Sequence, residues 1–198
     1  MLDKSIPYYG VLMIKHDTDN YPRYKLPEGF EFVGYSAGLE YEWARIEYEL
    51  EQFDNMDKAV ECFRREFNKP EEELNKTCFF VKAPDGKIAG ITSLWHGNAF
   101  GPDLPRVHWV AVDKDFQGLG LAKALITKLM DAYHENGFTD PIYLVTQTWS
   151  YKAINLYKEF GFEAYLGEKP VNWKKDDYDE MNPKAWAIID EKIRERKK

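Results

Sequence analysis

The sequence predicts a mixed α/β fold built on a central sheet, and three observations support this prediction. The segment 106–112, RVHWVAV, is rich in the β-branched and aromatic residues typical of strands. It leads through a glycine-containing turn into a run whose leucines recur at helical spacing. The segments 78–82 and 87–95 are two further strands, and the turn 83–86, APDG, joins them as a hairpin.

Hydrophobic periodicity and turn residues place the other elements in order along the chain. Further strands are expected at 8–14, 30–35, 142–147 and 162–166, and helices at 39–53, 55–67, 121–136, 151–160 and 183–196. Pro70 and the acids at 71–73 end the second helix or begin a short turn, and 96–105 is a loop. Ser150 is the expected N-cap of its helix, and Asn182-Pro183 signals the start of the last one.

Length and composition bound the class of protein. A chain of 198 residues with 44% hydrophobic content is expected to form a single domain, 1–198, with an N-terminal strand and connector at 8–29, a core at 30–166 and a C-terminal extension, expected to be helical, at 167–198. The net charge of −7 argues against a nucleic-acid partner. The sequence contains no membrane-spanning apolar run and no signal-peptide pattern, so no membrane partner and a cytoplasmic location are expected. The oligomeric state, including a homodimer, stays open.

Two cysteines, Cys62 and Cys78, are expected to be packed thiols. Neither has the Cys/His spacing of a metal site, so no metal is expected.

The turn 117–122, QGLGLA, is expected to bind a ligand. Gly118 and Gly120 allow the backbone to approach a ligand closely, and the first turn of the following helix offers N–H groups that suit a phosphate. A Rossmann fingerprint needs a third glycine and a P-loop needs G-K-[ST], and neither is present. A nucleotide-binding oxidoreductase is therefore a distant alternative.

Two motifs together resemble one enzyme superfamily. Gln117-x-x-Gly120-x-Ala122 resembles the Q/R-x-x-G-x-G/A pyrophosphate loop of the GNAT N-acetyltransferases. The block 153–162, AINLYKEFGF, resembles the A-x-x-L-Y-x-x-x-G-F block of the same superfamily, and the resemblance covers roughly 30–162. It implies a largely antiparallel sheet of about six to seven strands with helices on both faces, splayed between the strands 106–112 and 142–147. A C-terminal helix departs from the family, which usually closes its sheet with a strand here.

The resemblance also implies acetyl-CoA as acyl donor. Backbone N–H groups of 119–123 would then bind its pyrophosphate, and the strand 110–112 would pair with its pantetheine arm. Ser150 stands where the family often has asparagine. The implied cofactor-binding residues are Val110, Ala111, Val112, Gln117, Gly118, Leu119, Gly120, Leu121, Ala122, Lys123, Ser150 and Tyr157.

Three residues are candidates for proton transfer. Tyr157 matches the family tyrosine and would protonate the leaving thiolate as a general acid, unless it only packs on the sheet. His108 is the candidate base, because it lies two residues before Val110 and resembles a histidine of the serotonin N-acetyltransferase strand H-x-x-A-V. The alternative for His108 is a packed strand histidine. Glu47 is the rival base, from an acidic helix row with Glu40, Glu51 and Asp54 that would otherwise be a solvated face.

These observations predict an acetyl-CoA-dependent N-acetyltransferase in which a primary amine attacks directly. The acceptor is expected to be a cationic small molecule or peptide, because seven acids lie between Glu40 and Asp57 and only Arg45 offsets them. The alternative is a non-catalytic acyl-CoA-binding module or sensor with the same fold.

Overall fold

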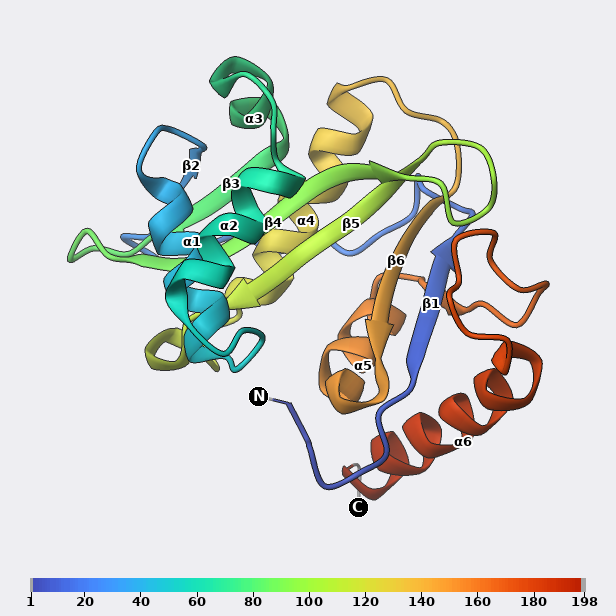
Figure 1. Cartoon of the computed structure of the whole chain (residues 1–198). Helices are drawn as coiled ribbons and strands as arrows, with labels where there is room; N and C mark the ends of the chain where they lie inside the picture. The colour runs from blue at the N-terminus through green and yellow to red at the C-terminus, as the bar shows by residue number, and fades with distance from the viewer. Residues whose placement is uncertain (1, 197–198) are drawn as a thin grey trace. The chain divides into compact units, whose positions relative to one another are not determined.

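The computed structural model describes residues 2–196, in which seven strands form one sheet in the order β2-β3-β4-β5-β6-β1-β7 (Figure 1). The chain separates into two compact units. The first contains 2–22, 95–107 and 138–196, and the second contains Arg23–Leu94 and His108–Gly137. Strands β4 and β5 contribute residues to both units.

The second unit contains β2 (Glu31–Gly34), β3 (Cys78–Lys82) and most of β4 (Ile88–Gly97) and β5 (Leu104–Val112). β3 pairs antiparallel with β2 and with β4. The predicted hairpin turn is confirmed, since the Gly86 N–H donates to the Ala83 carbonyl over 2.9 Å. The predicted loop 96–105 was too long, because β4 continues to Gly97 and β5 already begins at Leu104.

Helices pack on both faces of the sheet within this unit (Figure 1). They are α1 (Leu39–Glu49), α2 (Met56–Glu66), α3 (Glu71–Thr77) and α4 (Leu121–Glu135). On one face, Tyr35 contacts both Phe63 of α2 and Phe80 of β3. Phe79 is next to Phe80 and therefore points to the other face, where the ammonium group of Lys128 from α4 lies 5.0 Å from its ring.

Two helical predictions on this unit need correction. α1 ends at Glu49 rather than at residue 53, and Glu51 adopts a left-handed φ of 60° that a continuing helix excludes. Glu51 and Asp54 therefore lie outside the predicted acidic helix row. The segment after Pro70 is the seven-residue helix α3 rather than a short turn, and its three first-turn acids suit the positive end of the helix dipole. By contrast, α2 matches its prediction, with the side chain of Asn55 capping its N-terminus.

The first unit is built around β1 (Gly10–Lys15), which pairs antiparallel with β6 (Ile142–Gln147) and with the two-residue strand β7 (Glu163–Ala164). The predicted strand 162–166 is thus much shorter, and the strand predicted at 8–14 begins at Gly10. β5 joins this unit through Arg106 and Val107, which pair in parallel with β6.

Two helices belong to the first unit, α5 (Tyr151–Glu159) and α6 (Tyr178–Arg196). Ser150 occupies the N-cap position of α5 and is the last residue of the 3₁₀ turn η2 (Thr148–Ser150), but its side chain makes no capping hydrogen bond. The predicted C-terminal helix is confirmed, whereas its predicted start was wrong. α6 begins at Tyr178, so Pro183 lies inside it, and the Asn182 side chain instead donates to the Tyr165 carbonyl over 3.0 Å.

The mixed, largely antiparallel sheet confirms the predicted fold class, and the parallel pairing of β5 with β6 is its mixed part. The predicted splay concerns both units and stays a prediction. No helix within 2–196 has the length and apolar content needed to cross a membrane.

Candidate functional site

The glycine turn in the second unit joins the end of β5 to α4 through the 3₁₀ turn η1 (Lys114–Phe116). Gly118 and Gly120 have φ values of 84° and 82°, in the left-handed region that side chains other than glycine rarely adopt. Gly120 is the N-cap of α4, so the dipole of this 15-residue helix begins at the turn. The predicted strand, glycine turn and helix are therefore present in one unit.

The turn offers room and donors for an anion. A Cβ added at Gly118 or Gly120 would meet no atom of the described protein within 4 Å. Glycine is therefore required here by the positive φ and not by crowding, and open space remains beside the backbone of the turn. Leu121 and Ala122 are the first helical residues, and their N–H groups have no acceptor within the helix. The Lys123 N–H already donates to the Gly120 carbonyl over 3.0 Å, which makes it a weaker candidate than its two predecessors.

Arg45 of α1 anchors the point at which the turn leaves β5. Its guanidinium group binds the Asp113 carboxylate and donates to the Ile88 carbonyl over 2.9 Å. The other Asp113 carboxylate oxygen accepts from the Asp115 N–H over 2.9 Å and thereby caps η1. Gln117 also contacts the end of β5, since its side-chain amide donates to the Val112 carbonyl over 3.2 Å.

His108 and Trp109 of β5 share one acceptor, the Oε2 atom of Glu66 at the end of α2. His108 Nε2 lies 2.7 Å from this oxygen and Trp109 Nε1 lies 2.8 Å from it. Trp109 has a left-handed φ of 50°, which is unusual for a bulky residue in a strand. Its indole also packs edge-on against Trp43, with ring centroids 5.0 Å apart.

The left-handed Trp109 bears on the expectation, from their two-residue spacing, that His108 and Val110 lie on one face of β5. In a regular strand, consecutive side chains point to opposite faces, so two neighbours cannot reach the same atom. The left-handed Trp109 interrupts that alternation and brings both side chains to one carboxylate. The regular alternation from which His108 and Val110 were expected to share a face is therefore interrupted between them.

The hydrogen bonds also determine which nitrogen of His108 carries a proton. Although burial raises the pKa of Glu66, the hydrogen bonds from His108 and Trp109 outweigh it and lower that pKa to about 2. An ionised carboxylate only accepts hydrogen bonds, so His108 Nε2 is the donor. Any basic action of His108 must then use Nδ1.

Sequence reasoning missed Glu66. The residue follows Phe63 by three positions and precedes Phe67, so it flanks the apolar stripe of α2. That position was the one available signal, because a carboxylate beside a buried stripe tends to need a partner.

Glu47 differs from its prediction as a member of an exposed acidic row. Its side chain is buried, with a relative exposure of 3%, and burial raises its pKa to about 8. Several of the seven acids between Glu40 and Asp57 are also neutralised locally, since Glu42 and Glu49 both bind Arg45 and Asp54 binds Lys58.

The two cysteines are buried free thiols, as predicted. Burial raises the pKa of Cys62 to about 12 and that of Cys78 to about 11, so neither is a thiolate near neutral pH. Within 2–196, no three His, Cys, Asp or Glu residues group as metal ligands would.

Tyr157 and Ser150 belong to the first unit, whereas the glycine turn, His108 and Glu47 belong to the second. Tyr157 lies on α5 with its side chain largely buried, and its ring packs edge-on against Phe162 with centroids 5.9 Å apart. The approach of Tyr157 to an acyl donor on the glycine turn stays a prediction.

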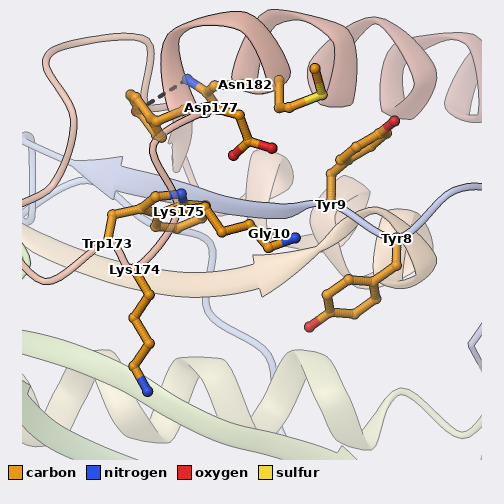
Figure 2. Close-up of a pocket in the computed structure, with 10 residues that line it drawn as sticks. Tyr8, Tyr9, Gly10, Trp173, Lys174, Lys175, Asp177 and Asn182 are labelled. Atoms are coloured by element: carbon orange, nitrogen blue, oxygen red, sulfur yellow. Dashed lines mark hydrogen bonds between the residues drawn. The ribbon is translucent and has the colours of Figure 1, made fainter.

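A pocket of about 160 Å³ lies in the first unit beside the start of β1 (Figure 2). Its wall includes Trp173, whose indole covers Gly10 so closely that a Cβ there would lie 2.8 Å from the ring. Figure 2 shows the Asp177 carboxylate between β1 and α6. No residue predicted for the site lines this pocket, which is lined by Tyr8, Tyr9, Gly10, Trp173, Lys174, Lys175, Asp177, Tyr178, Met181 and Asn182.

The fold and the glycine turn together define a mixed α/β domain with a glycine turn at the start of a long helix, and comparison with known proteins identifies its family. A model of the acetyltransferase (GNAT) family matches residues 39–162, more than half of the chain. The chain therefore belongs to the GNAT family of acetyltransferases, which confirms the predicted resemblance.

Individual relatives agree with this assignment. The chain is 33% identical over 92 residues to a glucosamine 6-phosphate N-acetyltransferase of Trypanosoma brucei brucei, a match covering 45% of this chain and 60% of that protein. It is 30% identical over 92 residues to an uncharacterized N-acetyltransferase of Methanocaldococcus jannaschii, covering 43% of this chain and 38% of that protein. The matches thus span less than two thirds of these relatives' own lengths.

A solved structure shares the fold. A GCN5-related N-acetyltransferase from Sphaerobacter thermophilus superposes with a TM-score of 0.57 at 20% sequence identity. The superposition covers 79% of this chain and 48% of that one.

The buried carboxyl group of Glu47 predicts a pH-dependent stability. Because its pKa is raised from 4.5 to about 8 in the folded state, its stabilising contribution is complete below about pH 4.5 and is lost as the pH rises to about 8. We expect Glu47→Gln to remove this dependence, which has a limiting slope of about 1.4 kcal/mol per pH unit. Urea unfolding of both proteins between pH 5 and 8.5 measures the difference.

Glu61→Gln is the matched control, because Glu61 is an exposed glutamate on α2. Its pH dependence should follow that of the wild type. Parallel curves for the wild type and Glu47→Gln would show that Glu47 does not titrate in this range.

Proposed function

We propose that the chain is an acetyl-CoA-dependent N-acetyltransferase in which a primary amine attacks the acetyl group directly. The observation that carries this proposal is the glycine turn at the start of α4, inside the segment matched by the GNAT family. The open space beside Gly118 and Gly120 and the positive end of the α4 dipole both suit a pyrophosphate.

When bound, acetyl-CoA would supply the acetyl group as a reactive thioester. The N–H groups of Leu119, Leu121 and Ala122 would hold its pyrophosphate, and the backbone of 110–112 would pair with the pantetheine arm. Gln117 would fix the turn through its bond to the Val112 carbonyl, which keeps these N–H groups in place. Ser150 would contact the cofactor from the start of α5.

A base is needed because an aliphatic ammonium group has a pKa of about 10.4 and is not nucleophilic at pH 7. His108 is our first candidate, since Glu66 binds its Nε2–H and orients Nδ1 as the basic nitrogen. Glu47 remains the rival. Its pKa of about 8 lies near the operating pH, which suits a general base.

Tyr157 is the proposed general acid. A phenol stays protonated at neutral pH and can donate a proton to a departing thiolate. The tyrosine matches the second family block and lies on α5, the helix that follows β6.

The proposed acceptor is a small amine that carries a positive charge, as the sequence predicted. Support from the seven acids between Glu40 and Asp57 is weaker than the sequence suggested, because Arg45 and Lys58 neutralise three of them and Glu47 is buried. The Trypanosoma relative is named for an amino sugar phosphate, which supports a small-molecule amine.

The second candidate function is an acyl-CoA-binding module without catalysis, in which the turn would bind the cofactor and Tyr157 would only pack. An amine panel separates the two. We expect acetyl-CoA to release free thiol faster with spermidine, an aminoglycoside or a lysine derivative than with neutral amines or glutamate. No amine-dependent thiol release, with coenzyme A still binding, would favour the module. Glutamate as the best acceptor would contradict a cationic one.

Gly120→Glu tests the cofactor loop. It adds a side chain and a negative charge beside the expected pyrophosphate, so the affinity for coenzyme A should fall at least about tenfold, or about 1.4 kcal/mol. Isothermal titration calorimetry measures the change. Gly120→Ala is the control, because it shares the backbone strain at φ 82° without the charge, and it should bind within about threefold of the wild type. Unchanged binding by folded Gly120→Glu would exclude this turn as the cofactor site.

Tyr157→Phe tests the general acid. The substitution keeps the packed ring and removes the hydroxyl proton, so kcat should fall by about 10²–10⁴-fold while KM for acetyl-CoA stays near its wild-type value. Steady-state kinetics with the best amine measures both constants. Tyr151→Phe, on the same helix, should leave them unchanged. A fall in kcat of less than about threefold would make Tyr157 a packing residue.

A further inference from the structure

We propose that Glu66 is the positioning residue of the proposed N-acetyltransferase site: its carboxylate holds His108 with Nδ1 as the basic nitrogen and holds Trp109 in its left-handed conformation. The inference rests on the proposed function. It follows from one observation, that two consecutive residues of β5 bind the same oxygen of α2 at 2.7 and 2.8 Å.

The backbone of Trp109 requires a compensating interaction. A bulky side chain at φ 50° is strained, and such conformations persist only where the surrounding structure fixes them. The contacts that fix this one include the indole N–H bond to Glu66, the edge contact with Trp43, and the tilted contact with Phe53, whose ring centroid is 5.8 Å away. Only the first depends on charge.

The same carboxylate determines how His108 would act. The indole N–H can only donate, and the ionised carboxylate can only accept, so His108 must donate from Nε2. In the proposed reaction, an N–H bond of the acceptor ammonium breaks and an Nδ1–H bond forms. The positive charge moves to the imidazole ring, where the Glu66 carboxylate stabilises it, and the proton then leaves to solvent.

The two carboxylate oxygens of Glu66 face different neighbours. Oε2 receives the two β5 donors, whereas Oε1 accepts from the Cys62 thiol over 3.4 Å and lies 3.6 Å from the Arg65 guanidinium group. Arg65 also donates to Cys62, and the buried Glu47 acts electrostatically on that thiol. The carboxylate is therefore held from both sides, and its pKa of about 2 keeps it ionised throughout the neutral range.

A purely structural carboxylate would need to bind only the strained Trp109. Here the imidazole of His108 binds the same oxygen at 2.7 Å and is itself buried, with a side-chain exposure of 9%. The Glu66 carboxylate thus binds the ionisable imidazole of His108 as well as the indole of the strained Trp109.

Glu66→Gln tests the inference, because it keeps the shape of the side chain and removes its charge. We expect kcat/KM for the amine to fall by about tenfold or more, with KM for acetyl-CoA changed by less than about threefold. The acid limb of the kcat/KM profile should move to lower pH, since a nearby carboxylate favours the protonated imidazole. The Trp109 indole N–H resonance, assigned with Trp109→Phe, should shift in ¹H–¹⁵N NMR spectra.

Glu61→Gln is the control, as an exposed glutamate on the same helix, and should change none of these quantities. Glu66→Asp keeps the charge and should recover part of the rate and of the pH profile. A folded Glu66→Gln protein with an unchanged rate, pH profile and indole resonance would overturn the inference alone. A wild-type chain that transfers no acetyl group to any amine would instead overturn the proposed function, whatever the indole resonance does.

Discussion

The interaction on which the second unit most depends is the pair of hydrogen bonds from His108 and Trp109 to one oxygen of Glu66. It joins the last residue of α2 to the middle of β5 and stabilises a backbone conformation that the strand would not adopt alone. The left-handed residue changes which side chains share a face, so the chemistry available along β5 follows from this contact. The position of the Glu66 charge beside the apolar stripe of α2 is therefore explained by its two bonds to β5. One of these bonds, to His108, also bears on proton transfer.

A second group of polar contacts, made by Arg45 of α1, fixes Asp113, the residue that follows β5. Arg45 binds Asp113 and the Ile88 carbonyl, and Asp113 in turn caps η1. The glycine turn thus begins from an anchored residue, although its two glycines adopt conformations with positive φ. A rigid strand end and a permissive turn together suit a loop that must present backbone N–H groups to a ligand in a defined direction. The Arg45 contacts come from α1 and the Glu66 contacts from α2, so these two helices shape the site as well as the core.

The sequence predicted the elements that periodicity and turn residues specify. The β3–β4 hairpin, α2 with its Asn55 cap and the glycine turn before α4 are local patterns, and the structure contains each of them. What it missed depends on contacts distant in the sequence. The strained Trp109 needs Glu66, 43 positions away, and no local pattern indicates that pairing. The burial of Glu47 likewise follows from packing, because its helix spacing alone was consistent with an exposed row. The start of α6 was predicted too late because Asn182 binds Tyr165 instead of capping a helix.

In the proposed enzyme, the glycine turn at the start of α4 binds the pyrophosphate of acetyl-CoA. The most direct measurement is an NMR titration of the ¹⁵N-labelled chain with coenzyme A, with dephosphorylated pantetheine as a ligand that lacks the pyrophosphate. We expect the amide resonances of residues 118–122 to shift with coenzyme A and to stay in place with pantetheine. Saturable binding of coenzyme A that leaves these five amides unmoved would contradict it.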